Sequence, residues 1–273
     1  MTRIIFVALA LAVGLTSARA DDCDDRLPDN RTAKGTKNIT EVWFANPTTR
    51  YRHFVLDSQY EAGALYARLR DGRVVHLTLP ETSVFENRQP RLADRAGDGG
   101  DRIVVVHTQL DRGASLAVVD VVSDALRFIA ETPTTGSVRT WLNIAGIADF
   151  YGDGHLSVAY VQMPHVLVRL RLGNFKNNKL IERGTLAGAT NHVAGTPNLG
   201  LAVFADFDGD GVAARPSLDR TSLSIISFRG GIREIGRKPL YSPATTDFRL
   251  EYVAGKPVVV VGLGGGRTQR VLF

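Results

Sequence analysis

The chain has 273 residues, of which 22% are charged, and a formal net charge of +5. Its basic residues are scattered: no run of five or more Lys or Arg residues occurs, and no segment interleaves basic with aromatic residues. We therefore expect no nucleic-acid binding. Cys23 is the only cysteine, which excludes an intramolecular disulfide.

Residues 1–20 have the pattern of a secretory signal peptide. A positive charge at Arg3 precedes the apolar stretch Ile4–Leu15, and small residues follow at Ser17–Ala20. The apolar stretch is too short to span a bilayer, and no later run approaches about 20 apolar residues. We therefore expect cleavage before Asp21, a periplasmic or secreted mature protein, and no membrane span. Cys23 is then an unpaired thiol near the new N-terminus, with an intermolecular disulfide as the alternative.

Residues 21–37 are polar and contain Pro28 and Gly35, which predicts a flexible N-terminal leader. From residue 38 onward, short alternating apolar runs are separated by turn residues, and no long helical period appears. The clearest pair of runs is Ala64–Arg70 and Arg73–Leu79, joined by Asp71–Gly72 in a tight hairpin. This pattern predicts an all-β chain.

Three acidic loops punctuate the strand-like runs. Each begins with an Ala-Asp step, at Asp94, Asp149 and Asp206, so that the copies are 55 and 57 residues apart. The third copy, Asp206–Gly211, reads Asp-Phe-Asp-Gly-Asp-Gly. Repetition at this period indicates a repeat architecture.

Each repeat contains one strand-like run before its loop and three after it, and incomplete copies precede and follow the three. A four-stranded unit buries only one face of a small sheet, so it needs neighbours. A closed ring leaves no long exposed edge. We therefore predict a β-propeller of about five four-stranded blades over residues 38–273, closed by pairing of Asn38–Phe44 with Arg267–Phe273.

The loops resemble the FG-GAP or VCBS-type repeats of the integrin α-subunit head and of many secreted bacterial proteins. The resemblance covers roughly residues 41–273 and rests on the three loops. It implies a propeller stabilised by calcium, in which the acidic loop connects the first two strands of a blade. It also implies a binding role without identifying the ligand.

Alternating aspartates in a tight loop point several carboxylates inward, as the hard cation calcium requires. The best candidate ligands are Asp206, Asp208 and Asp210; the later acid that the resemblance implies is replaced by Ala214. The weaker loops each keep two acids: Asp149 and Asp153, and Asp94 and Asp98. The alternative is that these loops are plain Asp/Gly turns. Any calcium would serve a structural purpose.

No local motif indicates catalysis. The histidines lack metal-site spacing, and no Gly-x-Ser-x-Gly segment supports a serine hydrolase. The glycine-rich segment Gly262–Arg267 lies between strands, which favours a turn over a phosphate-binding loop.

We therefore expect a non-enzymatic monomer that binds a protein or a glycan. Trp43, Trp141, Tyr151 and Tyr160 are candidates for a carbohydrate-binding surface, although Trp141 also suits packing between blades. The alternative is a hydrolase or lyase whose residues converge on the central channel from several blades.

Overall fold

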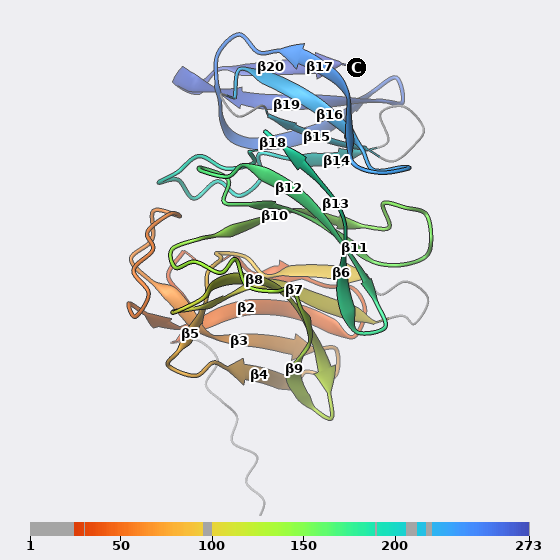
Figure 1. Ribbon diagram of the computed structural model, residues 1–273. Helices are drawn as coiled ribbons and strands as arrows, with labels where there is room; N and C mark the ends of the chain where they lie inside the picture. The colour runs from red at the N-terminus through yellow and green to blue at the C-terminus, as the bar shows by residue number, and fades with distance from the viewer. Residues whose placement is uncertain are drawn as a thin grey trace, which may run out of the picture.

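The computed structural model describes residues 25–29, 31–94, 100–188, 190–205, 212–216 and 220–272 (Figure 1). The described chain is built from antiparallel β-strands and contains no α-helix, which confirms the all-β prediction. No helix in these ranges is long and apolar enough to cross a membrane. The predicted signal peptide, Cys23, and the loop residues Asp98, Asp206, Asp208 and Asp210 lie outside the described residues.

The strands follow one another in five consecutive units. Unit 1 contains β1 (Ala33–Lys34), β2 (Ile39–Thr48), β3 (Glu61–Leu69) and β4 (Val74–Thr78). The short β5 (Ser83–Phe85) leads to unit 2, with β6 (Arg91–Asp94), β7 (Asp101–Gln109), β8 (Gly113–Val122) and β9 (Ala125–Glu131). Unit 3 contains β10 (Leu142–Ala148), β11 (Ser157–Gln162), β12 (Arg169–Lys176) and β13 (Lys179–Ala187). Unit 4 contains β14 (Val203–Ala205), β15 (Val212–Pro216), β16 (Ser222–Ser227) and β17 (Arg233–Pro239). Unit 5 contains β18 (Ala244–Val253), β19 (Lys256–Leu263) and β20 (Thr268–Leu272), with the 3₁₀ turn η1 (Gly264–Gly266) before β20.

Hydrogen bonding divides these strands into four sheets. β5 pairs with both β3 and β7, so units 1 and 2 share one nine-stranded sheet, whereas units 3, 4 and 5 form sheets of four, four and three strands. The predicted count of about five separate four-stranded blades is therefore not confirmed. The succession of small antiparallel sheets is consistent with a β-propeller-like fold.

The hairpin turns follow from local sequence. The predicted turn at Asp71–Gly72 joins β3 to β4, with Gly72 at a φ of 89°. Ser123–Asp124 and Asn177–Asn178 place two consecutive residues at positive φ, as does Gly230–Gly231. This is the backbone that two-residue hairpins require, and Asn, Asp and Gly tolerate it.

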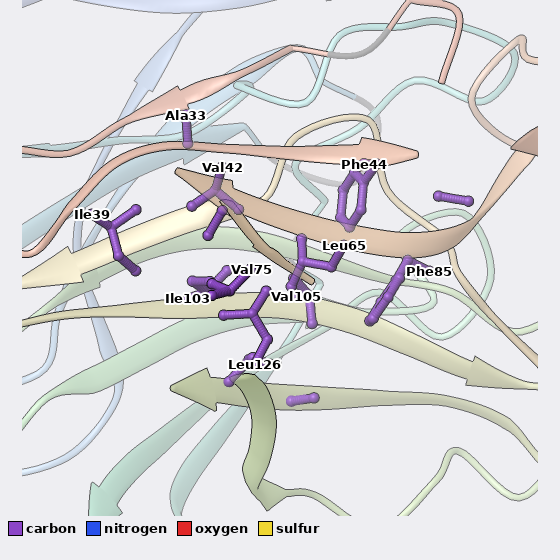
Figure 2. Packing of buried hydrophobic residues seen from close by; sticks show 14 of the residues in the cluster. Ala33, Ile39, Val42, Phe44, Leu65, Val75, Phe85, Ile103, Val105 and Leu126 are labelled. Atoms are coloured by element: carbon purple, nitrogen blue, oxygen red, sulfur yellow. The ribbon is translucent and has the colours of Figure 1, made fainter. Parts of the chain in front are cut away.

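Successive units pack face to face around apolar clusters. Phe44 and Leu65 of unit 1 meet Val105 of unit 2 in the largest cluster (Figure 2). Trp141 packs between units 2 and 3, as the structural alternative for this residue predicted. Further clusters join unit 3 to unit 4 through Phe228, and unit 4 to unit 5. Each fully buried large side chain contributes roughly 1.5–3 kcal/mol to folding.

The predicted pairing of the chain ends is not confirmed. β2 has β1 on one edge and β3 on the other, so it offers no edge to β20, which pairs with β19. No apolar cluster of the described residues joins unit 5 to unit 1. Arg31, just before β1, does reach β18, with its guanidinium 3.4 Å from the Asp247 carboxylate.

The predicted flexible leader is structured from residue 25 onward. The Leu27 N–H donates to the Phe44 carbonyl at 3.0 Å, and β1 continues along the same edge of β2. The Arg26 guanidinium lies 4.1 Å above the Trp43 ring centre. The leader therefore covers an edge and an aromatic ring that would otherwise face solvent.

Candidate functional site

In the second acidic loop the carboxylates cap the backbone. Asp149 accepts hydrogen bonds from the N–H groups of Asp153 and Gly154 at 3.1 and 2.8 Å, and Asp153 accepts one from the His155 N–H at 3.0 Å. Gly152 and Gly154 have positive φ. This arrangement fits an Asp/Gly turn.

The described chain contains no group of three or more His, Cys, Asp or Glu side chains placed to hold a metal ion. Calcium binding by Asp149 and Asp153, and by Asp94 and Asp98, stays a prediction. The backbone of Asp94 ends β6 opposite Asp101. Calcium binding by Asp206, Asp208 and Asp210 stays a prediction, because these residues lie outside the described ranges.

The predicted aromatic surface is not formed by the tryptophans. Trp43 and Trp141 are buried, as is Tyr160. Two other aromatic side chains are exposed near each other in the chain: Phe54 at 53% and Tyr60 at 38%. Both belong to the connection between β2 and β3, and both line a small pocket.

The pocket has apolar rims and a polar floor. Its free volume is about 20 Å³, which is enough for one water-sized group. The floor carries five polar side chains: His53, Glu61, Glu86, Asn87 and Arg88. They come from the β2–β3 connection, the first residue of β3, and the connection between β5 and β6.

Glu86 is the most deeply buried acid of the floor. One carboxylate oxygen contacts His53 Nδ1, and the other accepts a hydrogen bond from the Thr108 hydroxyl at 2.8 Å. Burial raises the pKa of Glu86 to about 7, against the opposing effect of these two partners. Its backbone carbonyl accepts a hydrogen bond from the Trp141 indole at 2.7 Å, which ties the pocket to unit 3.

Three buried polar atoms of the pocket have no hydrogen-bond partner in the described part of the chain. They are Glu61 Oε2, Asn87 Nδ2 and Arg88 Nε. The other groups of these side chains are used: Glu61 Oε1 accepts from the His53 N–H at 3.0 Å, and Asn87 Oδ1 accepts from the Arg88 N–H at 2.9 Å. Leaving a buried polar atom unpaired costs about 1–3 kcal/mol. The three residues that carry these buried atoms all line the pocket.

A pair of histidines packs against Trp141 of unit 3. His165 Nε2 lies 2.8 Å from His192 Nδ1, and His192 Nε2 lies 3.0 Å from the Thr196 carbonyl. Because a carbonyl only accepts, His192 carries its proton on Nε2 and accepts the hydrogen bond from His165 at Nδ1. Burial, reinforced by His165, lowers the pKa of His192 to about 3. The pair is therefore neutral at neutral pH and links unit 3 to the segment before unit 4.

No protein-family model and no curated protein matches the chain. The FG-GAP or VCBS resemblance accordingly rests on the three loops alone. The structure is similar to the solved structure of a protein from Lactobacillus plantarum, with 12% sequence identity and a TM-score of 0.47. That similarity covers 88% of this chain and 69% of the other.

Proposed function

We propose that this chain is an extracytoplasmic binding protein that recognises a glycan at the pocket between Phe54 and Tyr60. The observation that carries the proposal is that three residues with a buried, unpaired polar atom, Glu61, Asn87 and Arg88, line one pocket. A sugar hydroxyl both donates and accepts hydrogen bonds. One hydroxyl in this space would donate to Glu61 and accept from Asn87 or Arg88.

The rim supports the same ligand class. Phe54 and Tyr60 offer apolar ring faces beside the polar floor, which suits the C–H faces of a sugar ring. The floor combines two acids, Glu61 and Glu86, with Arg88 and His53, so no single charge dominates. We therefore favour a neutral glycan over an anionic one. Binding of a protein partner instead is an outcome of the test below.

The sequence supports a location and a scaffold for this pocket. The signal-peptide pattern over residues 1–20 supports a periplasmic or secreted location. We propose that the five units act as blades of a propeller-like scaffold that holds the pocket between units 1 and 2. Calcium at the loop of Asp206 would serve the scaffold and not the ligand.

A glycan array printed with neutral oligosaccharides tests this function. Wild-type protein should bind a defined subset, and Tyr60→Ala should weaken that signal about tenfold through the loss of ring packing. Tyr252→Ala is the matched control, because Tyr252 is 64% exposed and belongs to β18 in unit 5. The proposal fails if folded wild-type protein binds no neutral glycan, or if both tyrosine variants bind equally well.

A further inference from the structure

A hollow of about 470 Å³ lies between units 2 and 3. One wall is the connection from β9 to β10 at residues 132–135, and the other is the unit 3 sheet, from which Arg171 and Glu182 line the hollow. Of the residues that the structure describes, none lines both this hollow and the pocket of Phe54 and Tyr60. Its volume is within the range of small-molecule sites. The chain thus has a second space large enough for a ligand.

Strand register brings the polar side chains of the unit 3 wall to one face of the sheet. Tyr160 of β11 lies opposite Arg171 of β12, and Gly173, two residues further along β12, lies opposite Glu182 of β13. Opposite residues, and residues two positions apart on a strand, share a face. Gln162 follows Tyr160 by two positions on β11 and belongs to the same face. All of these residues line the hollow.

Arg171 joins the polar side chains of this wall in one network. Its Nε donates to Gln162 Oε1 at 2.7 Å, and its Nη1 contacts Glu182 Oε2. The Arg171 side chain is 24% exposed and that of Glu182 is 47% exposed, so a ligand can reach both. A guanidinium has five N–H donors and a carboxylate has two acceptor oxygens, so both groups keep capacity beyond these contacts. The wall therefore presents a positive group beside a negative one.

Fold stability alone gives little reason for this ion pair. Units 2 and 3 are joined by an apolar cluster that includes Leu142 and Tyr160, with Leu180 packed against it. An ion pair of this exposure adds little to folding, whereas apolar side chains at the same positions would extend the cluster. Charged groups beside an apolar wall and a hollow are instead typical of ligand sites.

The opposite wall is held in place by hydrogen bonds to β8. The N–H groups of Thr132 and Thr135 each donate at 2.9 Å, to the carbonyls of Leu116 and Ala114. In return, the hydroxyl oxygens of Thr132 and Thr135 accept from the N–H groups of the same two residues, at 3.0 and 3.1 Å. A wall fixed by its own backbone lowers the cost of ordering on binding. The hollow is therefore largely pre-formed.

Gly173 leaves part of this space open. It is buried in β12, and an added Cβ would lie 3.7 Å from Leu180 Cδ2 and 3.9 Å from Tyr160 Cε1, which is ordinary contact. Glycine weakens the interior of a strand and often marks a place where a ligand approaches closely. A larger side chain at this position would extend between two residues that line the hollow.

From this arrangement we propose that the hollow binds a free α-amino acid with an apolar side chain, a ligand independent of the glycan. The Arg171 guanidinium would pair with the ligand carboxylate, and Glu182 would pair with its ammonium group. Adjacent opposite charges on the wall match the adjacent opposite charges of a zwitterion, whereas an ion of one sign would meet repulsion from one of the two groups. Leu142, Leu180 and the Tyr160 ring would hold the apolar side chain.

Calorimetric titration of the mature protein with L-leucine and L-phenylalanine tests the ligand class. We expect saturable binding of at least one of them. N-acetyl-leucine lacks the ammonium group and leucinamide lacks the carboxylate, so each should bind at least about tenfold more weakly than leucine. Folded protein that binds neither amino acid would overturn the proposal. Equal binding of leucine and both analogues would also overturn it.

Variants of the ion pair test the charged groups. Arg171→Gln and Glu182→Gln should each weaken amino-acid binding at least about tenfold, with little change in unfolding temperature. Arg270→Gln is the matched control, because Arg270 pairs with Glu251 at 2.7 Å on unit 5 and is 57% exposed. Glycan binding at the other pocket should be unchanged in all three variants, which separates the two proposals. Equal amino-acid affinity in Arg171→Gln and Arg270→Gln would contradict this site.

Gly173→Val tests the space without a change of charge. The added carbon atoms should lower amino-acid affinity at least about tenfold by filling the hollow, and valine suits a strand. Gly236→Val in β17 is the matched control, because a Cβ added there meets no described atom within 4 Å. Thermal unfolding verifies that each variant is folded. Equal affinity in the two valine variants would place the ligand outside the hollow and overturn the proposal.

Discussion

The burial of Glu86 affects both the stability of the fold and the protonation state of the pocket. Burial disfavours its charged form, whereas His53 and Thr108 favour that form, and burial is the larger effect. The result is a carboxyl with a pKa of about 7 at the floor of a ligand pocket. Groups whose pKa is shifted in this way are concentrated at functional sites.

The free energy of unfolding should therefore depend on pH through Glu86. Its folded pKa of about 7 lies above the ordinary value of 4.5, so its contribution is complete below pH 4.5 and is lost as pH rises through 7. The loss is roughly 3 kcal/mol by the size of this shift. Glu86→Gln should remove the decline between pH 4.5 and 7, as measured by urea unfolding at a series of pH values.

His192 provides an internal control with the opposite sign. Its folded pKa of about 3 lies below the ordinary 6.5, so its contribution is present above pH 6.5 and is lost as pH falls toward 3. Glu86→Gln should leave unchanged this loss of unfolding free energy at acidic pH. An unchanged decline between pH 4.5 and 7 in the variant would show that Glu86 does not titrate as described.

At the scale of elements, hairpins were predictable and short strands were not. Turns such as Asn177–Asn178 follow from residue types that tolerate positive φ, and the long alternating runs around them identify strands. β1 has two residues and β5 has three, too few to show any period. Because β5 joins units 1 and 2 into one sheet, the number of sheets could not be predicted from the sequence.

The glycan pocket escaped prediction for a related reason. Phe54 and Tyr60 belong to a connection without periodicity, and Glu86–Arg88 follow a strand only three residues long. The pocket forms only where separate segments come together in the fold, and no local sequence pattern predicts which segments will be adjacent. The acidic loops, in contrast, could be recognised in the sequence because they repeat. Their repetition predicts where each repeat begins better than it predicts a ligand.

The loop between β14 and β15 carries the calcium prediction. Calcium that binds only the folded protein stabilises it by about 2.7 kcal/mol at a hundredfold excess over Kd. Wild-type protein should therefore unfold at a higher temperature in millimolar calcium than in EDTA, and Asp208→Ala should lose the difference. Differential scanning calorimetry measures both. Equal unfolding temperatures for the wild type in the two buffers would exclude the site.

At the scale of the whole molecule, units 1 and 5 each carry charged side chains on a face of their sheet. On unit 5, Glu251 lies opposite Val258 and Arg270 lies opposite Val260 in strand register, and the two charged groups pair at 2.7 Å. On unit 1, Arg26 covers Trp43. Exposed charged groups of this kind oppose association with another copy, because burying them would cost free energy.

We predict a monomer whose state depends on a few surface charges. Replacing Glu251 and Arg270 together by valine should create an apolar patch on unit 5, because these two side chains are 39% and 57% exposed. The double variant should then associate with increasing concentration, as measured by light scattering, while the wild type remains monomeric. A wild-type dimer at micromolar concentration would contradict this interpretation of the surface charges.

Calorimetric titration of a neutral glycan identified on the array tests the central claim most directly. Glu61→Gln replaces the open acceptor Oε2 with a side chain of the same shape, and Glu182→Gln on β13 is the matched control. Loss of a hydrogen bond to a charged group should weaken the affinity at least about tenfold in Glu61→Gln and leave Glu182→Gln unchanged. Equal affinity in the wild type and both variants would contradict glycan recognition at this pocket.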